Sequence, residues 1–218
     1  VNVRNEPSAG KTLKSVIIPG VCLICLAAST YPVTRAYRAA QAFYWALTFS
    51  NSRDWDASQM AVNRAISYGV FDYRMLLLKA HIYYHDGQYE KALEASRECL
   101  KYHPNSVEAY QRIGKLSILL NQLEAAREAF LKALELEPRE GSLYRDIAVT
   151  YRRLGQINEA HEAYKMALSR TPNDGQLMFN LAGFYRSQGR TEEALHRYRQ
   201  AVRLLPRFTQ AYIGLATS

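Results

Sequence analysis

The 218-residue sequence is poor in the residues that mark disulfide-rich, β-rich and disordered proteins. It contains only three Cys, seven Pro and eleven Gly, so it carries no disulfide framework and leaves long windows free to form helix. No segment alternates apolar and polar residues as a half-buried strand does. Because hydrophobic residues make up 48% of the chain, the composition supplies ample core material and has no signature of disorder.

The sequence also lacks the constellations that carry catalysis. It has no glycine-rich phosphate loop after a strand and no Gly-x-Ser-x-Gly elbow. His81 and His85 lie one helical turn apart, but their segment lacks the Glu of the metalloprotease motif and a third ligand. Glu192 and Glu193 fall at the start of an expected helix, where acidic residues favour the helix dipole. We therefore expect no enzyme activity, no metal and no cofactor.

The positive charge of the chain, +8 in total, is concentrated at its two ends. Residues 1–30 carry three basic and one acidic side chain, and residues 175–218 carry six Arg and two Glu. Residues 31–174 carry 19 basic and 17 acidic side chains, a mixture typical of solvated helical faces. Because no basic run is interleaved with aromatic residues, nucleic acid is not an expected partner.

The N-terminal part of the chain holds an uncharged apolar segment, from Val16 to Tyr31, after a polar, basic tail over residues 1–12. Two interpretations compete. The short apolar length favours a cleavable secretory signal. Alternatively, residues 13–31 form a transmembrane helix, with Lys14 snorkelling and Tyr31 at the interface. We expect the second, an uncleaved signal-anchor, because the 218-residue chain retains the segment.

The expected membrane orientation rests on the signal-like layout of this segment. The bias of positive charge is slight, since basic residues both precede and follow the apolar stretch. We expect a single-pass protein with its N-terminus in the cytoplasm and its larger part outside it, in the periplasm of a bacterium. Val1 is consistent with a GTG start codon, a further indication of a bacterial source.

The strongest pattern in the chain is a period of 34 residues. The repeated slots are Tyr110, Ile113, Gly114, Asn121, Ala126, Phe130, Ala133 and Pro138; then Tyr144, Ile147, Ala148, Gly155, Ala160, Tyr164, Ala167 and Pro172; then Met178, Leu181, Ala182, Gly189, Ala194, Tyr198, Ala201 and Pro206. The small residues let two helices approach, the Gly or Asn slot ends the first helix, and the Pro stops the second. Asn105 and Asn173 follow two of the prolines and are expected to cap the next helix.

This pattern resembles the tetratricopeptide repeat family. The resemblance covers four repeats in one frame, 73–106, 107–140, 141–174 and 175–208. It implies an all-α fold in which antiparallel helix pairs, about five of them, stack into a right-handed superhelical solenoid with a concave groove.

Two further segments fit the same frame less well. A degenerate first repeat covers residues 39–72, where Arg53, Ser58 and Val70 replace the Gly, Ala and Pro of the pattern. Those departures leave open whether its turn has the family geometry. Residues 209–218 match the start of another first helix and are expected to form a partial capping helix. The pattern leaves open whether the chain continues.

The resemblance also implies a binding surface, because in this family the first helix of each pair lines the groove. The residues carried over are Phe43, Tyr44, Leu77, His81, Tyr84, His85, Arg112, Lys115, Arg145, Arg152, Phe179, Asn180 and Arg186. The surface grades from aromatic to arginine-rich, which suits an extended peptide with acidic or aromatic residues. The alternative is that these are ordinary exposed positions and that binding uses another face.

The expected function follows from the anchor and the repeats together. We expect a membrane-anchored scaffold that binds protein partners, as a structural, accessory or assembly subunit of a multi-subunit membrane complex. Its partners would be other protein subunits in and beside the membrane. The alternative is a substrate-recognition module of a membrane enzyme or of a secretion or glycan-transfer system.

Overall fold

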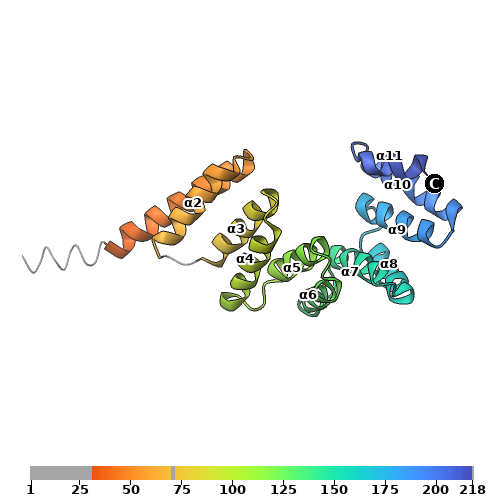
Figure 1. The fold of residues 1–218 in the computed structure, drawn as a ribbon, viewed down its shortest axis with the longest axis horizontal. Coiled ribbons are helices and arrows are strands. Elements are labelled where there is room, and N and C mark those ends of the chain that lie inside the picture. Colours follow the sequence, from red (N-terminus) through yellow and green to blue (C-terminus); the bar gives the residue numbers. More distant parts are fainter. Residues whose placement is uncertain (1–30, 70–71, 218) are drawn as a thin grey trace, which may run out of the picture. The chain divides into compact units, whose positions relative to one another are not determined.

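The computed structural model describes residues 31–69 and 72–217, and their regular structure is all α-helical (Figure 1). The described residues fall into two compact units, unit 1 up to Leu78 and unit 2 from Lys79 onward.

The predicted basic tail, 1–12, and nearly all of the predicted transmembrane helix, 13–31, lie outside the described residues. Among the residues that the structure describes, no helix has both the length and the apolar character needed to cross a bilayer.

Unit 1 contains a helical hairpin made of residues 31–51 and α2 (Trp55–Ser67). Small side chains at the contact let the two helices approach closely. Ala46 is fully buried, and the Ser58 hydroxyl donates a hydrogen bond to its carbonyl oxygen at 2.7 Å. Ser58 therefore replaces the Ala of the repeat pattern without leaving a buried polar group unsatisfied.

The turn of this degenerate hairpin has the backbone conformation of the other turns. Arg53 adopts a left-handed φ of 61°. The equivalent residues in the four later hairpins are Gly87, Asn121, Gly155 and Gly189, with φ of 75°, 57°, 75° and 73°. An arginine is strained there by roughly 1 kcal/mol relative to glycine. The departure at Arg53 therefore changes the residue but not the geometry.

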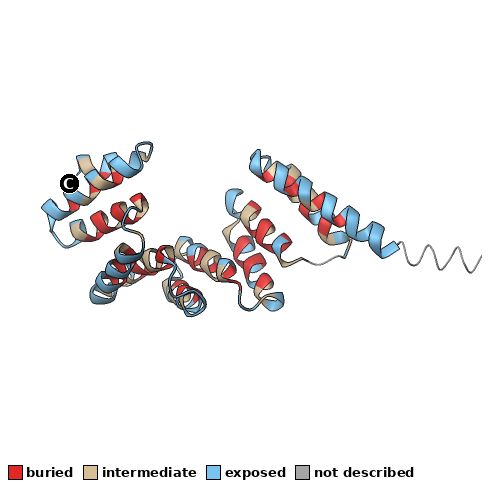
Figure 2. Ribbon diagram, turned by 180° about the vertical axis from the view of Figure 1, so that it is seen from behind, coloured by how far each residue is buried: buried red, intermediate tan, exposed pale blue. Residues whose placement is uncertain are grey.

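The remaining helices follow the 34-residue period. They are α3 (Tyr73–His85), α4 (Tyr89–Tyr102), α5 (Val107–Leu119), α6 (Leu123–Leu136), α7 (Gly141–Arg153), α8 (Ile157–Arg170), α9 (Gly175–Ser187), α10 (Thr191–Leu204) and α11 (Thr209–Ala216). In unit 2, α5 packs on α6, α7 on α8 and α9 on α10, and each pair contacts the next. Buried residues lie on the facing sides of these helices (Figure 2).

The ends of the helices show why the prolines and caps recur. The residue before each proline leaves the helical conformation, because proline disfavours that conformation in its predecessor. Its φ lies between −129° and −135° at His103, Glu137, Thr171 and Leu205. The predicted caps Asn105 and Asn173 are wrong by one position. Ser106 caps α5 by accepting from the Ala109 N–H, and Asp174 caps α9. The turn comprises the proline and the residue after it, 104–105 and 172–173, so the cap follows one position later.

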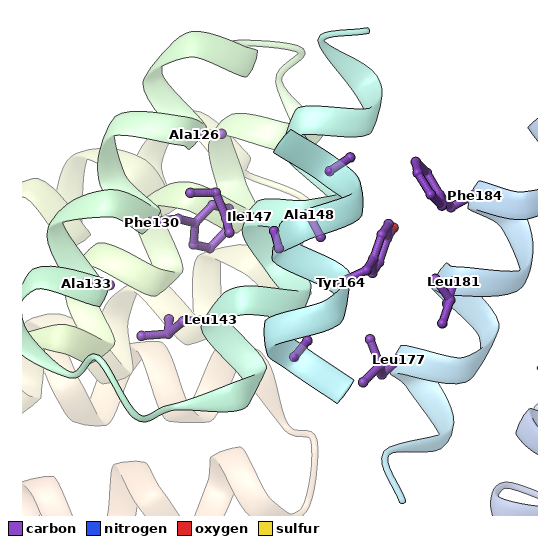
Figure 3. Close-up of a cluster of buried hydrophobic side chains, with 13 residues drawn as sticks. Ala126, Phe130, Ala133, Leu143, Ile147, Ala148, Tyr164, Leu177, Leu181 and Phe184 are labelled. Carbon is purple, nitrogen blue, oxygen red and sulfur yellow. The ribbon is translucent and has the colours of Figure 1, made fainter. Parts of the chain in front are cut away.

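The core of unit 2 is built on the aromatic slot of the repeat (Figure 3). Phe130 is fully buried among small side chains and Ile147. A β-carbon added at Gly114 would lie 2.5 Å from Cζ of the Phe130 ring, so only glycine fits there. One hairpin further on, Tyr164 fills the same slot and contacts Phe184 of α9 at 5.1 Å between ring centroids. The aromatic ring therefore joins one hairpin to the next.

Gly114→Ala is expected to lower the free energy of unfolding by about 1–2 kcal/mol, because overpacking against Phe130 outweighs the higher helix propensity of alanine. The matched control is Gly183→Ala in α9, where the nearest atom to an added β-carbon is 3.8 Å away. That variant is expected to gain about 0.5–1 kcal/mol. Urea unfolding of both variants measures the difference, and equal effects at the two sites would contradict the close approach at Gly114.

Candidate protein-binding face

The first helices of three successive hairpins form one surface in unit 2. α7 contacts both α5 and α9. Gln111 on α5 donates to the Asp146 carboxylate at 3.2 Å and to the Ser142 hydroxyl at 3.4 Å, both on α7. We call the surface formed by α5, α7, α9 and the C-terminal end of α3 the first-helix face. Its polar and aromatic residues are His81, Tyr84, His85, Gln111, Arg112, Lys115, Arg145, Asp146, Arg152, Gln176, Asn180 and Arg186.

A charge network occupies the centre of the first-helix face. Arg145 contacts Asp174 at 2.6 Å and Asp146 at 3.1 Å, and Lys115 lies 3.4 Å from Asp146. The side chains of Arg145, Asp146 and Asp174 are only 16%, 11% and 20% exposed. Burial disfavours the charged form of Arg145, but the two carboxylates outweigh burial and raise its pKa. Arg145 therefore stays protonated, and its positive charge is compensated by Asp146 and Asp174, so it does not present a free cation to a ligand.

Asp174 has a second role in the same network. Its other carboxylate oxygen accepts from the backbone N–H groups of Gln176 and Leu177 at 2.8 and 3.1 Å, which caps the N-terminus of α9. The ion pair with Arg145 consequently ties the start of α9 to α7. The repeat pattern does not mark Asp174 as a functional residue, although its place directly before a first helix is the signal for a cap.

Imidazole and phenol rings gather at the other end of the face. The rings of His81 and His85 meet edge to face at 4.5 Å between centroids, and Tyr84 contacts His85 at 5.2 Å and Tyr89 at 5.8 Å. Burial is the main cause that lowers the pKa of His81, and the neighbouring Arg112 guanidinium adds to it. Within residues 31–69 and 72–217, no three His, Cys, Asp or Glu side chains are grouped closely enough to hold a metal ion.

The lowered pKa of His81 predicts a pH dependence of stability. As pH falls, His81 binds a proton in the unfolded chain before it does so in the folded chain, because folding lowers its pKa. The free energy of unfolding is therefore unaffected by His81 above pH 6.5 and decreases as pH drops below that value. His81→Gln is expected to flatten this fall. Urea unfolding at pH 7.5 and 5.5, with an NMR titration of the imidazole, measures it. Titration of His81 at or above its ordinary pKa would contradict the argument.

The structure places the other predicted residues in unit 2 in differing surroundings. Arg112 is mostly buried and pairs with Glu108 at 2.9 Å, one turn away on the same helix. Phe179 is half-buried and packs against Phe208, with ring centroids 4.9 Å apart. Asn180 is half-buried and Arg186 is exposed, donating to the Thr217 hydroxyl at 3.1 Å. Phe179 therefore serves the packing of the C-terminal helices and does not extend the polar face.

Arg152 and the three predicted residues of unit 1 complete the set. Arg152 is half-buried beside Tyr164, whose pKa burial raises to about 12 while the guanidinium opposes the rise. Leu77 is only 6% exposed, so its side chain belongs to the core and not to a binding surface. Phe43 is half-buried, and Tyr44 is exposed with its ring edge against Trp45.

The fold and this surface define a class of protein, an all-α helical-repeat scaffold. Residues 26–210 match the model of the tetratricopeptide repeat family, and the chain belongs to that family. The fold is an all-α solenoid of tetratricopeptide type, which is typically a non-catalytic scaffold that binds proteins or peptides. A comparison with curated proteins finds no sequence that matches this chain.

Several solved structures share the fold. TTC0263, a thermophilic tetratricopeptide protein of Thermus thermophilus, is 22% identical with a TM-score of 0.69, over 82% of this chain and 97% of that one. MamA is 19% identical with a TM-score of 0.65, over 79% and 94% of the two chains. YrrB, a tetratricopeptide protein with an unusual peptide-binding site, is 15% identical with a TM-score of 0.61, over 79% and 89%.

Proposed function

We propose that this protein is a membrane-anchored scaffold whose first-helix face binds an extended, acidic segment of a protein partner. In this role it is an accessory or assembly subunit of a multi-subunit membrane complex. The observation that carries the proposal is the arrangement of charge on the face. Its central arginine is paired internally with two carboxylates. Lys115, which lies 3.4 Å from Asp146 but is 49% exposed, and Arg186, which is exposed and donates to the neutral Thr217 hydroxyl, still present positive charge to solvent on either side.

Cations at two separated points suit an extended chain better than a compact ligand. Lys115 lies on α5 and Arg186 on α9, so a peptide that reaches both must cross α7. Acidic residues of such a peptide gain charge-assisted hydrogen bonds at both points. The rings of Tyr84 and His85, both exposed, offer an apolar contact at the α3 end. The candidate partner therefore combines acidic residues with an aromatic or apolar anchor.

The proposed anchor rests on the sequence of residues 13–31, an apolar segment that follows a basic tail. We place the N-terminus in the cytoplasm and the repeats in the periplasm, since the segment is laid out like a signal sequence. Such an anchor would keep the repeats beside membrane subunits and raise the effective concentration of partners there.

A recognition module for a membrane enzyme is the second candidate. The polar character of the first-helix face favours it, because a charged, partly solvated surface supports reversible binding of a substrate protein. Exchange of the bound partner distinguishes the two roles. A subunit would stay bound through a detergent wash, whereas a substrate would be released and replaced within minutes.

The binding proposal is tested by charge removal on two faces. The full chain, in mild detergent, is used to capture partners, and the captured amounts are compared for Lys115→Gln and for the control Lys165→Gln on α8. Both lysines lie within 4 Å of a carboxylate, at 3.4 and 3.7 Å. Lys115→Gln is expected to reduce capture several-fold and Lys165→Gln to leave it unchanged. Equal effects would show that another face binds the partner.

The anchor is tested separately, by two charges placed in the apolar segment. Leu23→Lys with Leu26→Lys raises the cost of inserting a helix by about 6 kcal/mol and should release the protein from sedimented membranes. The control is the pair Leu119→Lys on α5 and Leu136→Lys on α6, both exposed. If the first pair leaves the protein in the membrane pellet, the segment is not its anchor.

A further inference from the structure

Unit 1 contains a groove that the first-helix face does not include. It lies between the helix of residues 31–51 and α2, with a volume of about 980 Å³. Its lining includes the apolar residues Trp45, Phe49, Met60 and Ala61 and two arginines, Arg38 and Arg64. Among the described residues that line it, none is acidic.

The 34-residue period shows what covers this position elsewhere in the chain. Three repeats later, the slots of Trp45, Phe49 and Ala61 are occupied by Ile147, Tyr151 and Ala163. Those three residues face Leu131 and Leu134 of α6, the second helix of the preceding hairpin. The groove in unit 1 is therefore the surface against which an interior hairpin receives the preceding helix.

The exposure of the equivalent residues shows that the surface of unit 1 is open. Ile147 is 2% exposed beneath α6, whereas Trp45 in the same slot is 47% exposed. Here an apolar residue appears where other hairpins are polar: Met60, 68% exposed, occupies the slot of Glu94, Glu128 and Glu162. The surface is thus more apolar than a solvated cap requires.

We propose that this groove binds an amphipathic α-helix of a partner protein, with an apolar stripe flanked by acidic residues. The helix takes the place that α6 takes in the interior of the stack. Apolar residues at i and i+3, as at Leu131 and Leu134, match the anchors used there. Arg38 and Arg64 are both exposed and select acidic flanks.

The length of the groove sets the length of the helix. The lining on the first helix runs from Arg38 to Phe49, about 17 Å at 1.5 Å per residue. A helix of three to four turns fills it, and α6 itself has 14 residues. This proposal is independent of the first-helix face, which lies in the other unit.

The experiment uses the full chain in neutral-detergent micelles and a helix-constrained peptide with the sequence of residues 123–136. The peptide carries the anchors Leu131 and Leu134, with three acidic and two basic residues, Glu124, Glu128 and Glu135 against Arg127 and Lys132. Saturable binding with a blue shift of tryptophan emission is expected, and the shift should disappear in Trp45→Phe. Met60→Glu should weaken binding about tenfold or more, because it places a charge in the groove and next to the acidic flanks.

Two controls and three outcomes decide the proposal. Leu47→Glu, on the same helix but outside the groove lining, should leave binding unchanged. The circular dichroism spectra of all variants should match that of the unsubstituted protein, which shows that their helical content is intact. No saturable binding, or equal binding to Met60→Glu, would overturn the proposal. Dimerisation abolished by Met60→Glu would identify a second copy of this chain as the occupant instead. If brominated detergent quenches Trp45 fluorescence and the peptide does not relieve the quenching, the acyl chains of the membrane, and not a partner helix, occupy the groove.

Discussion

Phe130→Ala is expected to lower the free energy of unfolding by about 3–5 kcal/mol, the largest effect of a single substitution in unit 2. The ring is fully buried and packs on Gly114 of its own hairpin and on Ile147 of the next. Gly114 has no side chain that could move into the cavity left by the ring. Urea unfolding measures the loss, and Phe130→Leu, which retains part of the volume, should lose only about 1 kcal/mol.

A double substitution separates packing from a general loss of stability. In the Phe130→Ala background, Gly114→Ala should no longer destabilise, because the ring that its β-carbon would overlap is gone. The coupling energy between the two sites is expected to be about 1–3 kcal/mol. Strictly additive effects would mean that the close approach of Gly114 to the ring does not determine stability.

Arg145→Met is expected to lower the free energy of unfolding by about 2–3 kcal/mol. It removes the cation and leaves Asp146 and Asp174, both largely buried, without their main partner. Breaking a buried ion pair costs about 3–5 kcal/mol, and we reduce that figure because each side chain retains some contact with water.

A surface ion pair provides the matched control. Lys132 contacts Glu135 at 2.8 Å, but the two side chains are 58% and 63% exposed. Lys132→Met should leave the free energy of unfolding nearly unchanged, because water screens an exposed ion pair. Equal losses for Arg145→Met and Lys132→Met would contradict a structural role for the network on the first-helix face.

The period of the sequence predicts most of the helical architecture because each slot has a local cause. A proline stops a helix wherever it stands, and Gly87, Gly155 and Gly189 reach the left-handed region at no steric cost. At Arg53 the sequence alone leaves the turn open, since arginine rarely adopts positive φ. The structure shows that packing of the flanking helices imposes the same turn on an unfavourable residue.

The surface is less predictable, because it depends on which side chains meet across helices. The family pattern assigns Arg145 to the groove, but it cannot show that Asp174, 29 residues later, neutralises it. Likewise, Leu77 occupies a groove slot and is nevertheless buried. Position within a helix determines the direction of a side chain, whereas its charge partner can come from a distant part of the chain, as Asp174 does at the start of α9.

Site-specific photo-crosslinking tests the central claim, that the first-helix face holds the partner. A photoreactive amino acid replaces Lys115 on that face or Lys165 on the outer helix α8, in the full chain, and crosslinked peptides are identified by mass spectrometry. The account predicts crosslinks from position 115, mapped to a single acidic segment of one partner, and almost none from position 165. Crosslinks from position 165 alone, or equally from both, would contradict it.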